Sequence, residues 1–139
     1  MKFILSTIIV AIVLFVLGWL FYAAIFANFF KEYYSLIQRS PEDMRLWAIA
    51  VGCLLEAFFL AWIYPKGYKG GSPFGEGFKF GLYIGLLMGV PYVFFTWAMM
   101  PVTYKALVVD GLITIFNTTV AGIVTGLIYG KIEKPAATT

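Results

Sequence analysis

The chain of 139 residues is too apolar and too weakly charged for a soluble domain. Hydrophobic residues make up 62% of it and charged residues 12%, against about 45–50% and about 25% in soluble proteins. Its mean hydropathy is +0.90. The net charge of +3 comes from lysines and arginines at the ends of apolar runs. This pattern suits phospholipid headgroups and argues against binding to nucleic acid.

The composition also excludes several kinds of catalytic site. The single cysteine, Cys53, rules out an internal disulfide. The absence of histidine rules out Ser-His-Asp and Cys-His catalysis within one chain. We expect no transition-metal site and no cofactor. Since no nucleophile–base pair is visible, we predict that the protein is not an enzyme.

The first apolar segment covers residues 3–30 and follows a basic residue, Lys2. A basic start and an apolar core are also typical of signal peptides, which is the alternative interpretation. The run is too long for a signal peptide, however, and no small-x-small cleavage site follows it cleanly. We therefore predict an uncleaved transmembrane helix, tilted because its 28 residues exceed the thickness of the bilayer core.

A polar loop, residues 31–45, follows the first helix. Its motif Ser40-Pro41-Glu42-Asp43 predicts the start of the second helix, with Ser40 as N-cap and Pro41 in the first turn. The remaining helices are predicted over residues 46–64, 75–100 and 106–130, and a polar tail over 131–139.

These segments predict an all-α membrane protein, a four-transmembrane-helix bundle in a single domain over residues 1–139. Pro65 is expected to end the second helix, and Pro91 to kink the third. The ends of the second and fourth helices, residues 63–66 (IYPK) and 128–131 (IYGK), are similar. The chain is therefore compatible with two helical hairpin repeats.

The positive charges predict the orientation of the chain in the membrane. One side would carry six basic residues: Lys2, Lys66, Lys69, Lys79, Lys131 and Lys134. The other side would carry four: Lys31, Arg39, Arg45 and Lys105. Because cytoplasmic loops are richer in lysine and arginine, we predict that both termini are cytoplasmic.

Glycines recur at every fourth residue in the last two predicted helices. The third contains Gly77, Gly81, Gly85 and Gly89, and the fourth Gly122, Gly126 and Gly130. Small residues at this spacing let two helix backbones approach closely. The pattern predicts helix packing either between these helices of one chain or between chains in a homo-oligomer.

Glu56, the only charged residue of the second helix, lies near its middle. A carboxylate at the centre of a bilayer costs several kcal/mol unless it is protonated or has polar partners. We therefore expect the other three helices to shelter it. Counting about 1.5 Å per residue from the helix ends brings five candidate ligand-binding residues to a similar depth: Asn117, Thr118, Tyr22, Tyr92 and Trp19.

Asp110 begins a polar face on the fourth helix. Thr114, Asn117, Thr118, Ala121 and Thr125 follow it at spacings of three and four residues. Such a face should look inward, towards Glu56, or line a wet cleft that opens at Asp110. Asp110 is thus a candidate ligand-binding residue, or alternatively an acid in the first helical turn, where the helix dipole favours it.

Two interpretations of Glu56 remain open at this point. In one, Glu56 is neutral and forms a structural hydrogen-bonded knot with Asn117, a threonine or a tyrosine. In the other, it forms a site that exchanges a proton for a cationic or amphipathic guest, or holds a lipid headgroup.

A further indication comes from the ends of the first and last helices. The first contains Gly18-Trp19-Leu20-Phe21-Tyr22 and then Phe26, and the last ends in GIVTGLIYG, residues 122–130. With four short helices, these features resemble a bacterial family of small four-helix membrane proteins of unknown function. The resemblance implies a four-helix fold and a bacterial inner membrane, but no activity. In size and in its single intramembrane glutamate the chain is also similar to small multidrug exporters, although their glutamate lies in the first helix.

The leading functional hypothesis is a non-enzymatic membrane protein that binds or transports a small amphipathic molecule or lipid in a mid-bilayer cleft around Glu56. The alternative is an accessory or scaffolding subunit that docks on a partner in a membrane complex through the glycine faces. In that case Glu56 would be a structural polar knot.

Overall fold

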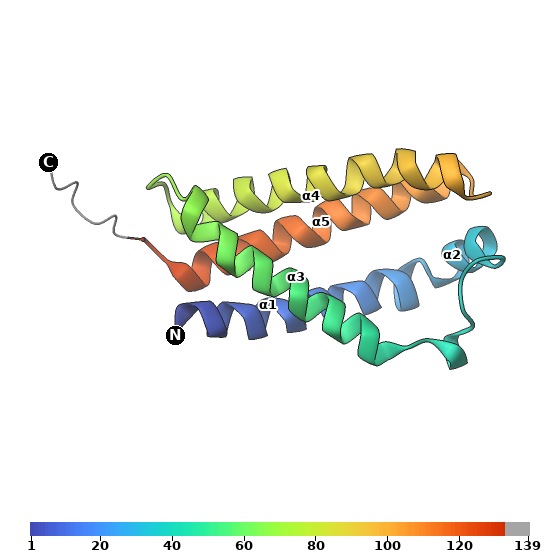
Figure 1. The fold of residues 1–139 in the computed structure, drawn as a ribbon, viewed down its shortest axis with the longest axis horizontal. Helices are drawn as coiled ribbons and strands as arrows, with labels where there is room; N and C mark the ends of the chain where they lie inside the picture. Colours follow the sequence, from blue (N-terminus) through green and yellow to red (C-terminus); the bar gives the residue numbers. More distant parts are fainter. Residues whose placement is uncertain (133–139) are drawn as a thin grey trace, which may run out of the picture.

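A computed structural model describes residues 1–132 of the chain, which form helices joined by short connections (Figure 1). The predicted tail, including Lys134, lies almost wholly outside these residues. The elements, in order, are α1 (Lys2–Trp19), the π-helical segment η1 (Leu20–Ile25), α2 (Ala27–Tyr34), the 3-10 turn η2 (Pro41–Asp43), α3 (Leu46–Gly67), α4 (Pro73–Met99) and α5 (Tyr104–Tyr129).

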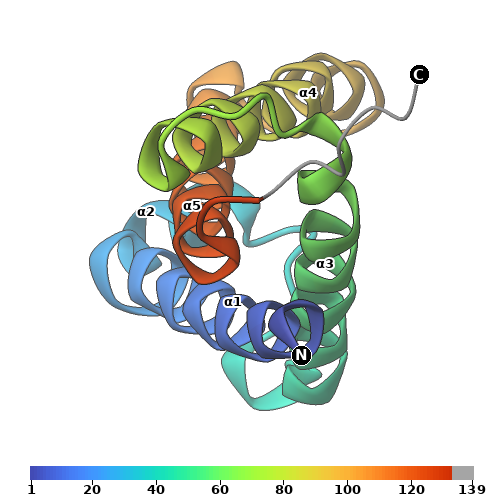
Figure 2. The same cartoon turned by 90° about the vertical axis from the view of Figure 1, so that its left-hand side faces the viewer.

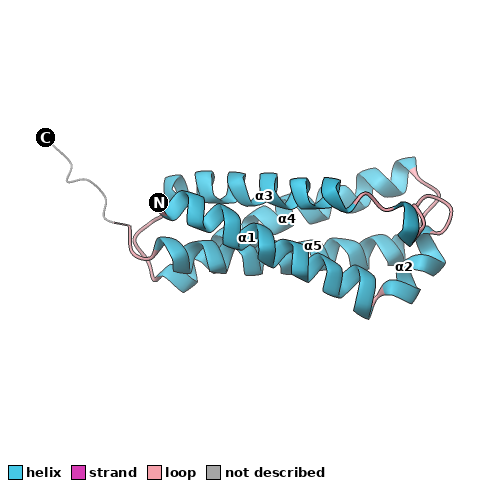
Figure 3. Cartoon of the chain, turned by 90° about the horizontal axis from the view of Figure 1, so that it is seen from below, coloured by secondary structure: helices cyan, strands magenta, loops and turns pink. Residues whose placement is uncertain are grey.

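The prediction of an all-helical protein is confirmed for residues 1–132, in which every regular element is a helix (Figure 3). Four spans are long and apolar enough to cross a membrane: Lys2–Ile25, Leu46–Gly67, Pro73–Met99 and Tyr104–Tyr129. Their lengths of 22 to 27 residues meet the requirement of about 20 residues for one crossing. These features are those of an integral membrane protein.

The helices pack as two pairs, and α5 joins one pair to the other. Helix α4 lies along α5, and α1 lies along α3, while α5 also contacts α1 and α3. Viewed from the end, α5 lies between α4 and α1, and α3 stands to one side (Figure 2). The contact between α3 and α4 is sparse. This sparse contact leaves a groove between the two helices, which is described below.

The close contact of α4 with α5 depends on glycine. A Cβ atom added at Gly81 would lie 2.6 Å from the carbonyl oxygen of Thr118, and one added at Gly85 would lie 2.9 Å from the Cα atom of Ile115. On the facing helix, Gly122 and Gly126 abut α4 backbone in the same way. The two glycine faces therefore meet within one chain.

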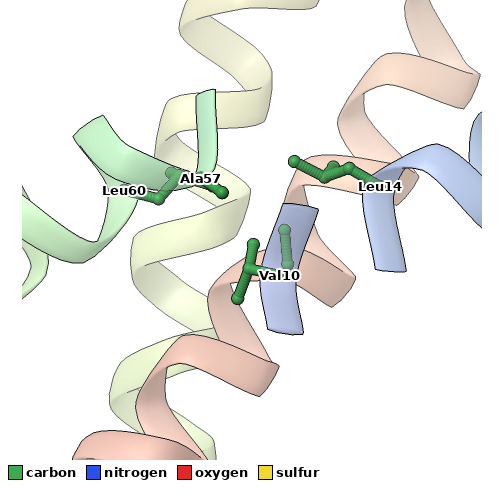
Figure 4. Packing of buried hydrophobic residues seen from close by; sticks show 5 residues of the cluster. Val10, Leu14, Ala57 and Leu60 are labelled. Atoms are coloured by element: carbon green, nitrogen blue, oxygen red, sulfur yellow. The ribbon is translucent and has the colours of Figure 1, made fainter. Parts of the chain in front are cut away.

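A small apolar core joins α1, α3 and α5. Val10 and Leu14 of α1 pack against Ala57 and Leu60 of α3 (Figure 4) and against Ala121 of α5. Nearer the chain ends, the ammonium group of Lys2 donates a hydrogen bond to the carbonyl oxygen of Tyr129 at 2.7 Å. The start of α1 and the end of α5 therefore lie at the same end of the molecule.

The first predicted helix is not continuous over residues 3–30. Its end is the π-helical segment η1, in which the Phe26 amide donates to the Phe21 carbonyl five residues earlier, at 2.9 Å. The backbone of Phe26 then leaves helical geometry, and α2 restarts at Ala27. Helix α2 continues to Tyr34, four residues into the predicted loop.

Ser40 does not cap the second long helix, contrary to the prediction. Its hydroxyl group donates to the Asp43 carboxylate at 2.9 Å within the separate turn η2. Helix α3 begins only at Leu46, with Arg45 in the N-cap position. The motif is local in effect because Met44 is extended and interrupts the helical path.

Pro65 does not end α3, which continues to Gly67. A proline inside a helix leaves the carbonyl four residues earlier without its donor, and here that carbonyl belongs to Ala61. The hydroxyl group of Tyr129 donates to the Ala61 carbonyl at 2.7 Å in a buried position. A tertiary hydrogen bond thus replaces the missing helical one. Helix α4 likewise continues through Pro91.

We expect Tyr129→Phe to destabilise the protein by about 1–2 kcal/mol, because it leaves the buried Ala61 carbonyl unpaired. In a Pro65→Ala background the restored amide of residue 65 can serve that carbonyl, so the same substitution should cost about 1 kcal/mol less. The free energy of unfolding in mixed detergent micelles is measured for the parent, the two single variants and the double variant. Tyr104→Phe, at an exposed tyrosine, is the control. Equal costs in both backgrounds would refute the exchange of donors.

Candidate functional site

The candidate residues from the sequence form two separate groups in the structure. Tyr22 and Tyr92 are hydrogen-bonded to Asp110, whereas Glu56 is hydrogen-bonded to Thr118. The sequence predicts one cleft in which Tyr22 and Tyr92 face Glu56. The hydrogen bonds instead join both tyrosines to Asp110. A shared depth along the helices does not set the direction in which each side chain points.

The first group is a carboxylate surrounded by phenols, which we call the Asp110 cluster: Asp110, Tyr22, Tyr34 and Tyr92. Tyr22 donates to Oδ1 of Asp110. Tyr34 and Tyr92 donate to Oδ2, at 3.3 Å and 3.0 Å. Asp110 lies six residues beyond the first residue of α5, Tyr104. The interpretation of Asp110 as a first-turn acid is therefore wrong.

Each tyrosine reaches the cluster from a different element. Tyr22 belongs to η1, and Tyr34 is the last residue of α2. Tyr92 belongs to α4, directly after Pro91. Tyr34 is not among the predicted site residues, because the sequence predicts a loop over residues 31–45. The spacing of Phe26, Phe30 and Tyr34 at intervals of four is the signal that could have placed it on a helix.

A cavity of about 240 Å³ adjoins the Asp110 cluster. It is lined by Tyr22, Phe30, Tyr34, Ile37, Gln38 and Asp110. The ring of Phe30 lies 4.9 Å from that of Tyr22 and 5.5 Å from that of Tyr34, between ring centroids. Burial and the nearby Asp110 carboxylate raise the pKa of Tyr34, so its hydroxyl group keeps its proton and remains a donor.

The second group lies around Glu56, which is half-buried on α3. The Thr118 hydroxyl group of α5 donates to its Oε1 atom at 3.5 Å, a long and weak hydrogen bond. Glu56 lines a groove of about 210 Å³ between α3 and α4, here called the Glu56 groove. Its other lining residues are apolar: Phe59, Leu60, Ile63, Ile84 and Met88.

Two other predicted residues lie outside both groups of hydrogen bonds. Asn117 is 9% exposed, and its side-chain oxygen is buried without a partner among residues 1–132. It lies one helical turn before Ala121, which packs on α1 and α3. Trp19 is 61% exposed at the end of α1, so its ring lies on the outer surface.

No group of three or more His, Cys, Asp or Glu side chains within residues 1–132 could hold a metal ion. Comparisons of the chain with protein-family models, with curated proteins and with solved structures gave no match.

Proposed function

We propose that the protein is a non-enzymatic four-helix bundle of a bacterial inner membrane, with both termini in the cytoplasm. In this proposal it binds a small cationic amphiphile in the Glu56 groove. The observation that carries the proposal is a half-buried carboxylate whose walls are apolar and whose hydrogen bond, from Thr118, is 3.5 Å long.

An ionised Glu56 calls for a cationic partner. A carboxylate in apolar surroundings is stabilised by an opposite charge far more than by one weak hydrogen bond. The basic residues at the two ends of α3, Arg45 and Lys66, lie about 16 Å and about 15 Å away along the helix. Lys66 also lies over the ring of Trp62, 3.5 Å from its centroid. A ligand cation would supply the missing charge.

The remaining walls of the groove suit the apolar part of such a ligand. Phe59, Ile63 and Met88 are 49%, 37% and 42% exposed, so they offer apolar surface that a guest can cover. Burying such surface contributes about 25 cal/mol per Å². Cation and apolar chain would thus bind to adjacent parts of one groove.

The packing of helices in pairs, α1 on α3 and α4 on α5, supports the two-hairpin architecture as part of this proposal. The alternative function, a scaffolding subunit that docks through its glycine faces, has less support. Those faces lie against each other between α4 and α5, so docking would need another surface.

Dodecylamine, compared with its neutral analogue dodecanol, tests the proposed ligand class. We expect the protein in lipid nanodiscs to bind the amine roughly 10- to 100-fold more tightly than the alcohol, as for a charge-assisted hydrogen bond. Glu56→Gln should abolish this preference, and Met88→Trp should weaken both ligands by filling the groove. Isothermal titration calorimetry measures the affinities, and titration of empty nanodiscs corrects for partitioning of the ligand into the lipid.

The matched control is Glu32→Gln, which neutralises an exposed glutamate on α2 and should leave the preference unchanged. A cooperative unfolding transition of each variant in detergent shows that the variant is folded. A Glu56→Gln protein that is folded and keeps the full preference for the amine would refute the proposed function.

A further inference from the structure

We propose that the cavity beside the Asp110 cluster is a second binding site, one that takes an alkylammonium group such as a trimethylammonium head. It would bind the cation between the Asp110 carboxylate and the rings of Tyr22, Phe30 and Tyr34. The Glu56 groove shares none of these lining residues, so this inference is independent of the proposed function.

The hydrogen-bond partners of Asp110 bring no positive charge to it. They are three neutral phenol groups, which fix the orientation of the carboxyl group. A carboxylate offers about four lone-pair positions, and three phenols leave one of them open on Oδ1. The site therefore offers a carboxyl group in a fixed orientation on the wall of the cavity.

The aromatic wall explains why the cation would be an alkylammonium ion rather than a bare metal ion. The rings of Tyr22, Phe30 and Tyr34 follow one another at centroid distances of 4.9 Å and 5.5 Å. Methyl groups carrying a positive charge are attracted to such ring faces within about 6 Å. Ile37, which is 43% exposed and lines the cavity, also supplies apolar surface, which a hydrated metal ion would not use. A volume of about 240 Å³ suits a head of a few carbon atoms.

The local backbone supports a built site. The π-helical segment η1 carries Tyr22 and ends at Phe26, from which α2 departs with Phe30 and Tyr34. Single π-helical turns inside α-helices occur frequently at functional sites. Here the change of path allows one short stretch of chain to supply all three rings of the cavity.

Tetramethylammonium and choline are the probes for this site, with the uncharged carbon analogue 3,3-dimethylbutanol as reference. In nanodiscs of phosphatidylglycerol, which has no choline, we expect both cations to bind and the alcohol not to bind at comparable concentration. Asp110→Asn should weaken cation binding at least tenfold. Phe30→Leu should weaken it roughly 3- to 30-fold, the range of one cation–π contact. Asp43→Asn, at an exposed aspartate, is the matched control and should have no effect.

The natural source of the ammonium group is distinguished by changing the lipid. If phosphatidylcholine nanodiscs abolish the binding of free choline, the lipid headgroup occupies the cavity. If free choline binds equally in both lipids, a soluble amine is the ligand. If Asp110→Asn does not fold, Phe30→Leu decides the test, because it leaves the carboxylate intact. Equal binding of choline and its uncharged analogue, or a folded Phe30→Leu protein with unchanged affinity, would overturn the proposal.

Discussion

Gly122→Ala is expected to destabilise the protein by about 2–4 kcal/mol, a large effect for one added methyl group. A Cβ atom at this position would lie 2.5 Å from the Cα atom of Gly81 and 2.6 Å from its nitrogen. It would also lie 2.6 Å from the carbonyl oxygen of Gly77. All three atoms belong to the α4 backbone, so no side chain can move aside and the two helices must separate.

The matched control is Gly52→Ala on α3, where an added Cβ would have no neighbour within 4 Å. Since alanine favours a helix over glycine by up to about 1 kcal/mol, this variant should be as stable as the parent protein or more stable. The two variants and the parent protein are compared by the concentration of denaturing detergent at which each unfolds. If Gly122→Ala unfolds at the same point as the parent, α4 and α5 are not packed as closely as described.

The second large effect is expected from Asp110→Ala, which removes one acceptor from three tyrosine hydroxyl groups. Hydrogen bonds to a charged group contribute about 1.5–3 kcal/mol each in water-soluble proteins, but about 0.6 kcal/mol on average between membrane helices. We therefore expect a total loss of about 2–5 kcal/mol. Because Tyr34 joins α2 to the other helices through Asp110, the loss should be greatest in α2.

Hydrogen–deuterium exchange locates this effect. Amides of α2 should exchange faster in Asp110→Ala than in the parent protein, while amides in the middle of α3 should be little changed. Asp43→Ala removes a carboxylate that is bonded only within its own turn, to Ser40, and should leave α2 unaffected. Uniformly faster exchange over all helices would instead indicate a general loss of stability, without a special role in holding α2.

The apolar runs predicted the four long helices because length and hydropathy alone decide whether a segment can cross a bilayer. The same reasoning could not find the change of path at η1. An apolar stretch such as Leu20–Ile25 has equal hydropathy in an α-helix and a π-helix. It also could not foresee that α3 would pass through Pro65, since the replacement donor, Tyr129, lies 64 residues further along the chain.

The positions of the candidate residues could be predicted in part. Depth along the helices predicts Thr118 at the level of Glu56, and the two side chains are hydrogen-bonded. Depth says nothing, however, about which side of a helix faces which neighbour. Tyr22 and Tyr92 were therefore assigned to the wrong carboxylate. The glycine spacing carried more information, because glycines four residues apart define one side of a helix, and those sides meet in the structure.

The sparse contact between α3 and α4 has a consequence for how occupancy of the Glu56 groove depends on experimental conditions. Phe59, Ile63 and Met88 border the groove and are partly exposed on the flank of the helices, where acyl chains would surround a spanning protein. A guest arriving from that side is governed by its mole fraction in the membrane. Adding empty vesicles at constant total ligand should therefore reduce occupancy, even though the amounts of protein and ligand in the sample stay the same.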